Sequence, residues 1–130
     1  SNRIILDPVI SYLAQFPVLN SIKIWYSPAN QKLVDESTQF FHIDHEDYKR
    51  IKVYIYLNDI DKNSGPLHII PKGLTKNIYT ELKRKKKITR RNQKINDDLV
   101  FNLNKDLKLI NFSGKKGQIN FVDTCNCYHF

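Results

Sequence analysis

The segment IKVYIYL, residues 51–57, constrains the fold of this chain more than any other. It is dense in β-branched and aromatic residues, which pack well on the pleated surface of a sheet and therefore favour a strand. Side chains alternate along a strand, so every second residue from Val53 faces one way and every second residue from Lys52 faces the other. The segment predicts a strand with one aliphatic face and one face that carries a lysine and two tyrosines.

Further short runs of the same character follow along the chain, separated by turn-rich sequence. They cover residues 21–27, 39–44, 66–70, 99–103, 107–112 and 117–123. Helical patterns occupy residues 76–87 and 7–20, where Asp7 suits the N-cap and Pro8 the first helical position. Short strands between turns, with a helix in front, predict a mainly-β barrel or jelly roll. With 130 residues the chain is long enough for one such domain, residues 1–130, and too short for two.

Eight basic residues and no acidic one lie between Lys83 and Lys94. The other thirteen basic residues balance the thirteen acidic ones, so the formal charge of +8 arises from this basic insertion, residues 83–94. Like charges repel one another and bury nothing, which favours a solvated surface loop. The alternatives are a lid that attracts an anionic substrate and a module that binds nucleic acid. The nucleic-acid reading is the weaker, because only Tyr79 lies nearby to stack on a base.

The overall composition of the chain predicts its cellular compartment. Hydrophobic residues make up 41% of the chain, which is enough for a folded core. No apolar stretch reaches the length of a membrane span and no signal-peptide pattern is present, which predicts a soluble cytoplasmic protein. The two cysteines, Cys125 and Cys127, are too close in sequence for a disulfide between them to stabilise the fold. So few cysteines, placed in this way, fit a reducing compartment.

Three residues indicate a metal site. His42 and Asp44 are two positions apart, so on a strand they project from the same face. A second histidine, His129, ends another strand-like run 87 positions after His42. Two histidines and one carboxylate are the ligands of the facial triad, which holds Fe(II) and leaves the opposite positions open. A zinc site of Cys125, Cys127 and His129 is a weaker alternative, because three ligands without a fourth do not close a tetrahedral site.

These segments resemble, in the same order, those of the phytanoyl-CoA dioxygenase family of Fe(II)/2-oxoglutarate oxygenases. The matching pieces are IWYS, QFFHID, VYIYLND, NSGPLHIIPKG and GKKGQINFVDTCNCYH, which fall within residues 21–130. The resemblance implies a double-stranded β-helix (a jelly roll) with a short N-terminal helix. It also implies that His42, Asp44 and His129 bind Fe(II), with 2-oxoglutarate and O2 as cosubstrates.

The function implied is a dioxygenase that hydroxylates a small molecule. Tyr54 and Gln39 take positions that relatives place beside 2-oxoglutarate, and relatives that halogenate carry a small residue in place of Asp44. The arginine that relatives use for the distal carboxylate has no counterpart, because the chain stops one residue after His129. The N-terminal helical region is also shorter than in relatives. Together these two differences imply that the chain is the core of a longer protein, shortened at both ends. The alternative is a cupin-type metal-binding jelly roll that works without 2-oxoglutarate.

Overall fold

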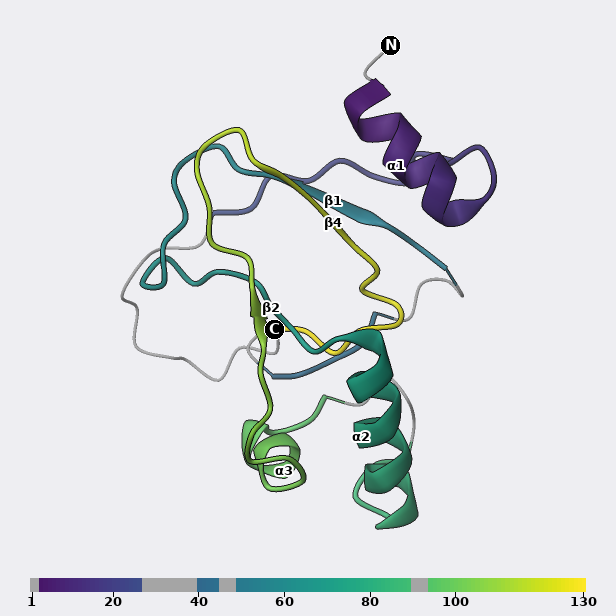
Figure 1. Ribbon diagram of the computed structural model, residues 1–130, viewed down its shortest axis with the longest axis vertical. Coiled ribbons are helices and arrows are strands. Elements are labelled where there is room, and N and C mark those ends of the chain that lie inside the picture. The colour runs from purple at the N-terminus through teal and green to yellow at the C-terminus, as the bar shows by residue number, and fades with distance from the viewer. Residues whose placement is uncertain (1–2, 27–39, 45–48, 90–93) are drawn as a thin grey trace.

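The computed structural model describes residues 3–26, 40–44, 49–89 and 94–130. In chain order its elements are α1 (Arg3–Leu13), β1 (Lys52–Ile55), β2 (His68–Ile69), α2 (Lys72–Arg84), α3 (Asp97–Phe101), β3 (Ile110–Asn111) and β4 (Ile119–Val122), as Figure 1 shows. The three helices contain more residues than the four strands. The prediction of a mainly-β double-stranded β-helix, or jelly roll, is therefore wrong.

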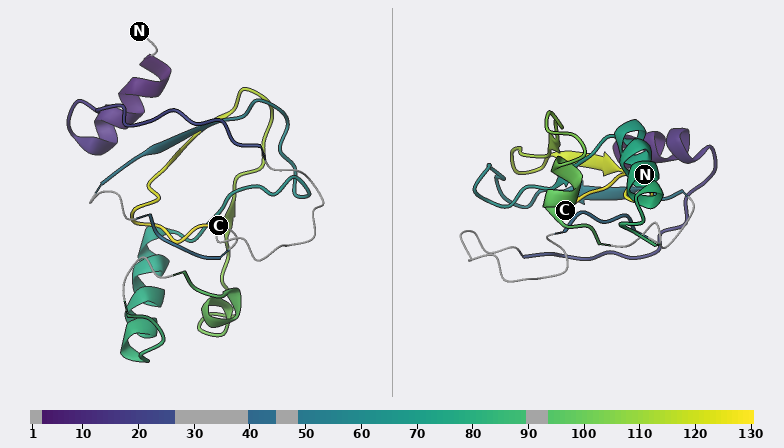
Figure 2. Two further views of the ribbon diagram at one scale, coloured as in Figure 1. Left: turned by 180° about the vertical axis from the view of Figure 1, so that it is seen from behind. Right: turned by 90° about the horizontal axis from the view of Figure 1, so that it is seen from below.

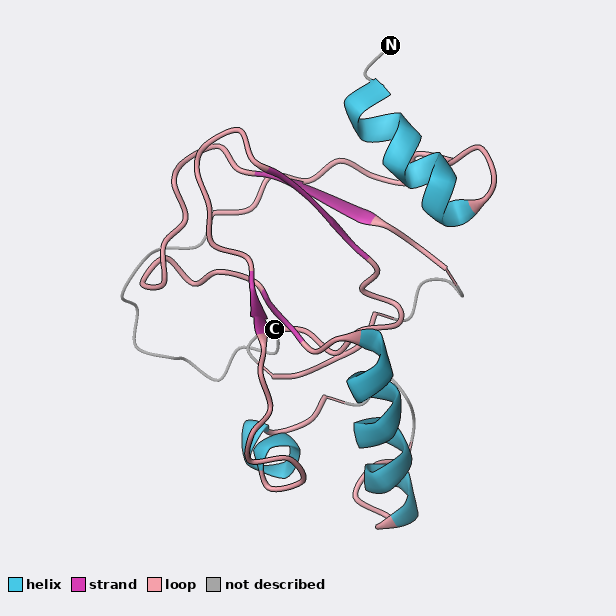
Figure 3. Cartoon of the chain, viewed as in Figure 1, coloured by secondary structure: helices cyan, strands magenta, loops and turns pink. Residues whose placement is uncertain are grey.

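The strands form two separate antiparallel pairs (Figure 3). β1 pairs with β4, with Lys52 opposite Val122 and Ile55 opposite Ile119, and β2 pairs with β3. Four of the predicted strands are thus present in shortened form, those at residues 51–57, 66–70, 107–112 and 117–123. Two-stranded pairs of this size bury little by themselves, so packing against other segments must stabilise them.

Two predicted strands take other conformations. Residues 99–103 begin within α3, because the Asn96 side chain accepts a hydrogen bond of 2.9 Å from the N–H of Asp98 and caps the helix. Residues 21–26 are exposed and form neither helix nor strand, and they pair with no strand in the described part of the chain. An alternating pattern makes a strand only where a partner satisfies its backbone groups, and the described residues offer no such partner to 21–26.

Isolated bridges outside the named strands tie distant segments together. His129 bridges to both His42 and Ile69, so the C-terminal segment runs antiparallel between two parts of the chain that are far apart in sequence. Within the described residues 40–44, the strand predicted at 39–44 is reduced to bridges at Phe41 and His42. Figure 1 shows the C-terminus next to β2, as these bridges require, and the left view of Figure 2 shows the same neighbourhood from behind.

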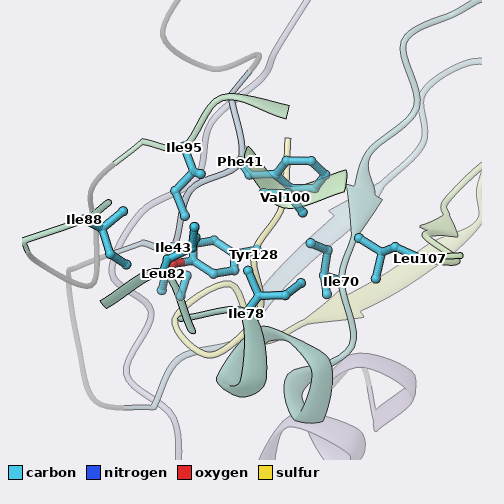
Figure 4. Packing of buried hydrophobic residues seen from close by; sticks show 10 residues of the cluster. All are labelled: Phe41, Ile43, Ile70, Ile78, Leu82, Ile88, Ile95, Val100, Leu107 and Tyr128. Atoms are coloured by element: carbon cyan, nitrogen blue, oxygen red, sulfur yellow. The ribbon is translucent and has the colours of Figure 1, made fainter. Parts of the chain in front are cut away.

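The apolar core lies where α2 and α3 pack against the bridged segments (Figure 4). Its members are Phe41, Ile43, Ile70, Ile78, Leu82, Ile88, Ile95, Val100, Leu107 and Tyr128. The helix predicted at residues 76–87 is confirmed, although α2 begins earlier, directly after Pro71. It buries Thr75, Ile78 and Leu82, which recur at helical spacing on one face. This end of the molecule therefore carries most of the hydrophobic stabilisation.

The helix predicted at residues 7–20 needs correction at both ends, because α1 covers Arg3–Leu13. α1 starts four residues earlier than the helix predicted at 7–20, so Asp7 is not its N-cap and Pro8 lies inside it. A proline within a helix removes one backbone hydrogen bond, which weakens α1 at that point. The hydroxyl of Tyr12 donates to Asp123 and ties α1 to the segment after β4. None of the helices in the described ranges has the length and apolar run that a membrane crossing needs.

The basic insertion does not begin as a loop. Lys83 and Arg84 belong to the last turn of α2, where positive side chains interact favourably with the helix dipole. Ile88 then turns into the apolar core. Residues 90–93 lie outside the described ranges.

Candidate metal centre

Three side chains gather where the segment carrying His42 meets the C-terminal segment. Two backbone hydrogen bonds of 3.0 Å join His42 and His129 through their N–H and carbonyl groups. The N–H of Asp44 donates to the carbonyl of Thr124, also at 3.0 Å, and continues this pairing. Ile43 is buried in the apolar core, so backbone alternation turns His42 and Asp44 to the opposite side. Backbone pairing therefore brings together the three residues that the sequence singled out.

The geometry lets His42, Asp44 and His129 each direct one ligand atom toward a common point. These atoms all lie within 4.8 Å of one another. The two histidine Nε2 atoms are each 3.9 Å from Oδ1 of Asp44, and the imidazole centroids are 4.2 Å apart. Around an octahedral ion with bonds of about 2.1 Å, neighbouring ligand atoms lie about 3 Å apart. To surround such an ion, each histidine Nε2 would have to approach Oδ1 by roughly 1 Å and the widest pair of ligand atoms would have to close by roughly 2 Å.

Hydrogen bonds to backbone carbonyls set the tautomer of both histidines. Nδ1 of His42 lies 2.9 Å from the carbonyl oxygen of Phe40, and Nδ1 of His129 lies 3.0 Å from that of Cys127. A carbonyl oxygen only accepts, so each Nδ1 carries a proton, and in the neutral imidazole the lone pair is then on Nε2. This is the tautomer in which a histidine binds a metal through Nε2, with its other nitrogen fixed by the protein.

Lys52, on β1, holds the second oxygen of Asp44, with Nζ 2.5 Å from Oδ2. Burial by itself raises the pKa of the Asp44 carboxyl, but hydrogen bonds from Lys52 and Thr124 outweigh it and lower that pKa below its usual value. The carboxylate is therefore ionised at neutral pH. Its Oδ1 faces the histidines while Oδ2 is occupied by the lysine, which favours monodentate ligation.

Burial also keeps His129 neutral. Desolvation, together with the neighbouring imidazole of His42, lowers the pKa of His129 to about 4. A neutral imidazole is the form that binds a metal. The His129 side chain is 4% exposed and that of His42 is 21% exposed, so the cluster is reached from the side of His42.

Tyr54, predicted to lie beside 2-oxoglutarate, stands two positions after Lys52 on β1 and so shares its face. Burial raises the pKa of Tyr54 to about 12, and the nearby charge of Asp44 adds to the shift, so its hydroxyl stays protonated. Its role with a cosubstrate stays a prediction. The other predicted cosubstrate residue, Gln39, lies outside the described residues.

Sequence reasoning did not identify Lys52 and Thr124 as parts of the site. The face of β1 that carries Lys52 and Tyr54 turns inward, whereas Ile55 on the opposite face is 49% exposed. Leu57, beyond the strand, is 63% exposed. The available signal was the lysine two positions before a tyrosine, on the same face of the strand. A half-buried strand ordinarily turns its aliphatic face inward, so the usual rule indicates the wrong face here.

The cysteines do not join the cluster. Among the described residues, the group that could hold a metal contains neither Cys125 nor Cys127. Burial raises the pKa of the Cys127 thiol to about 11, and the charge of Asp123 contributes, so the thiolate that would bind zinc is disfavoured. The geometry gives the alternative zinc site no support.

Comparisons of the chain with protein-family models, with curated proteins and with solved structures give no match. Any functional argument therefore rests on the site.

Proposed function

We propose that His42, Asp44 and His129 bind Fe(II), and that the chain is a Fe(II)/2-oxoglutarate-dependent dioxygenase that hydroxylates a small molecule. The observation that carries this proposal is the arrangement of two imidazole Nε2 atoms, each 3.9 Å from the same carboxylate oxygen. Two imidazoles and one carboxylate on one side of an ion leave the opposite positions open for a cosubstrate and oxygen.

The residues present fit such a centre. Its donors are nitrogen and oxygen, which suit Fe(II), and the described cluster contains no thiolate, which would favour zinc. Bound iron supplies the redox chemistry that activates O2, with 2-oxoglutarate as the electron donor. A halogenating centre would need the carboxylate position vacant, and Asp44 fills it, which supports hydroxylation.

The chain's own residues orient the ligands. The carbonyls of Phe40 and Cys127 hold the two Nδ1 protons, so both Nε2 lone pairs face the same point. Lys52 holds Oδ2 of Asp44 and leaves Oδ1 for the metal. Partners of this kind commonly change metal affinity by about 10–100-fold when they are removed.

Metal binding is tested by comparing Asp44→Ala with Asp59→Ala. Both changes remove an aspartate that pairs with a lysine, but Asp59 is exposed and pairs with Lys115 at the surface. Under anaerobic conditions we expect the native chain and Asp59→Ala to bind equimolar Fe(II), and Asp44→Ala to bind none while staying folded by circular dichroism. Unchanged iron content in Asp44→Ala would contradict the assignment.

The role of 2-oxoglutarate is tested on the same material. Titration of the anaerobic Fe(II) protein with 2-oxoglutarate should produce a metal-to-ligand charge-transfer band, because the 2-oxo acid chelates the iron. Iron binding without any such band would favour the alternative, a metal-binding protein that works without 2-oxoglutarate.

A further inference from the structure

The exposed side of α2 carries a row of lysines. Residues 72–87, which cover α2 and the turn that ends it, contain seven basic residues and one acidic residue. Lys72, Lys76 and Lys83 are four and seven positions apart, and this spacing brings them to one face of the helix. All three are exposed, whereas the apolar side of α2 turns into the core. With a rise of about 1.5 Å per residue, the row is about 16 Å long.

The turn after α2 holds further lysines in a defined conformation. The N–H of Lys87 donates to the carbonyl of Leu82 at 2.9 Å, and that of Lys86 donates to the carbonyl of Lys83 at 3.0 Å. These two hydrogen bonds form a Schellman motif, which closes the end of a helix. Ile88 follows and is buried in the core at 4% exposure. Residues 85–87 are therefore part of a packed surface. Together with Lys72, Lys76 and Lys83 they form the basic face of α2.

Lys86 occupies a position that favours glycine. Its φ is 53°, in the left-handed region, where a side chain crowds the backbone. Helices that end in this motif usually place glycine here, because glycine has no such penalty. Backbone strain of this kind is concentrated at functional sites. A lysine at this position is explained if its charge contributes to binding.

The lysines of the basic face have no acidic partner among the described residues. Arg84 pairs with Glu81 at 2.8 Å, but none of these lysines forms an ion pair there. Like charges repel one another, so a row of cations on an ordered surface is unfavourable until an anion neutralises it. The length of the row requires an anion with several charges along it.

The surroundings favour nucleic acid over a lipid surface. A helix that lies on a membrane inserts apolar side chains next to its basic ones. Within the described ranges, none of the exposed large hydrophobic side chains belongs to residues 72–89. Tyr79 packs against the core, and Nζ of Lys83 lies 5.9 Å from the centroid of its ring, so the ring is not open to a stacked base. Phosphate contacts need no stacking, and lysines along a helix supply them.

We propose that the basic face of α2 binds the phosphate backbone of double-stranded nucleic acid without reading its sequence. This function is separate from the proposed metal centre and does not depend on it. The sequence argument against nucleic acid, a single nearby tyrosine, concerns base stacking and does not apply to a duplex bound through its phosphates.

The experiment measures the fluorescence anisotropy of a labelled DNA duplex of mixed sequence as the protein is added at several salt concentrations. The logarithm of the affinity should fall linearly with the logarithm of the salt concentration, with a slope of about −0.9 for each phosphate neutralised. Lys76→Gln combined with Lys83→Gln removes two cations of the row. We expect this pair to weaken binding about tenfold or more and to reduce the slope by about two.

The matched control combines Lys62→Gln with Lys116→Gln, which removes the same charge from two exposed lysines outside the basic face. Its affinity and slope should stay close to those of the native chain. Equal losses in the two pairs would show that net charge alone attracts the duplex, and would overturn the proposal.

Lys86→Gly separates binding from stability. Glycine adopts the left-handed conformation without strain, so this change should raise the midpoint of urea unfolding while it weakens duplex binding. Higher stability with unchanged binding would overturn the role of the turn.

Vesicles that contain phosphatidylserine test the lipid alternative on the same proteins. A native chain that binds these vesicles but not the duplex, or that binds neither, overturns the proposal. The Fe(II) content of all these variants should equal that of the native chain, because none of the changes removes a proposed metal ligand. The outcome for the duplex is therefore independent of the outcome for the metal centre.

Discussion

The apolar core at α2 and α3 and the inward face of the β1–β4 pair differ in the kind of side chain that they bury. Every member of the core is aliphatic or aromatic, and its burial follows the hydrophobic periodicity of the helices. The β1–β4 face instead turns Lys52, Tyr54 and Asn120 inward and leaves Ile55 exposed. Burying polar groups costs free energy unless they find partners. The core thus accounts for stability, whereas the polar face holds groups that surround the proposed metal centre.

The largest effect should come from the core. Leu82→Ala in α2 removes a side chain that is 1% exposed, and we expect it to lower the free energy of unfolding by about 2–5 kcal/mol. Leu57→Ala, at a position that is 63% exposed, should change it by less than about 0.5 kcal/mol. Urea unfolding measures both. The Fe(II) affinity of the folded Leu82→Ala protein should be unchanged; a parallel loss would show that the two regions are not independent.

The next effect tests the polar region through pH. The pKa of His129 is about 4 in the folded chain, against 6.5 for an unburied histidine, so the unfolded state takes up the proton first. Stability of the metal-free protein should therefore fall as the pH is lowered from 6.5 to 4, by roughly 3 kcal/mol. Below that window the lowered pKa of Asp44 extends the loss. Urea titrations across this range should show a flatter pH dependence of the free energy of unfolding for His129→Gln than for the native chain. The control, His68→Gln, should show the same pH dependence as the native chain.

The smallest effect concerns Lys52. Its side chain is 35% exposed, but its partner Asp44 is only 15% exposed, so the loss of Lys52 leaves a largely buried carboxylate without its lysine. Because it holds Oδ2 of Asp44, we expect Lys52→Gln to weaken Fe(II) binding about 10–100-fold, and Lys52→Arg to restore most of it. Competition with a chromophoric chelator measures the affinity. A tighter Fe(II) complex in Lys52→Gln would mean that the lysine competes with the metal for Asp44.

Prediction from sequence succeeded where the signal was local. The strand around residues 51–57 and the helix at residues 76–87 follow from composition and periodicity, and both are present, although the helix starts earlier, at Lys72. The stretch at 99–103 was misassigned, because the capping side chain of Asn96 lies just outside the apolar run and favours a helix. Residues 21–26 show a limit of the alternating pattern, because the pattern predicts a strand but does not indicate whether a partner strand is present.

The sequence by itself determined which residues were candidates for the metal centre, since His42 and Asp44 are spaced to share a face and His129 offers a third ligand. Only the tertiary structure decided that the three meet, because the backbone pairing of His42 with His129 joins segments far apart in the chain. It also decided which face of β1 turns inward and which groups hold the ligands, namely Lys52 and two carbonyls. Such contacts depend on register and twist between distant segments, and no local pattern encodes them.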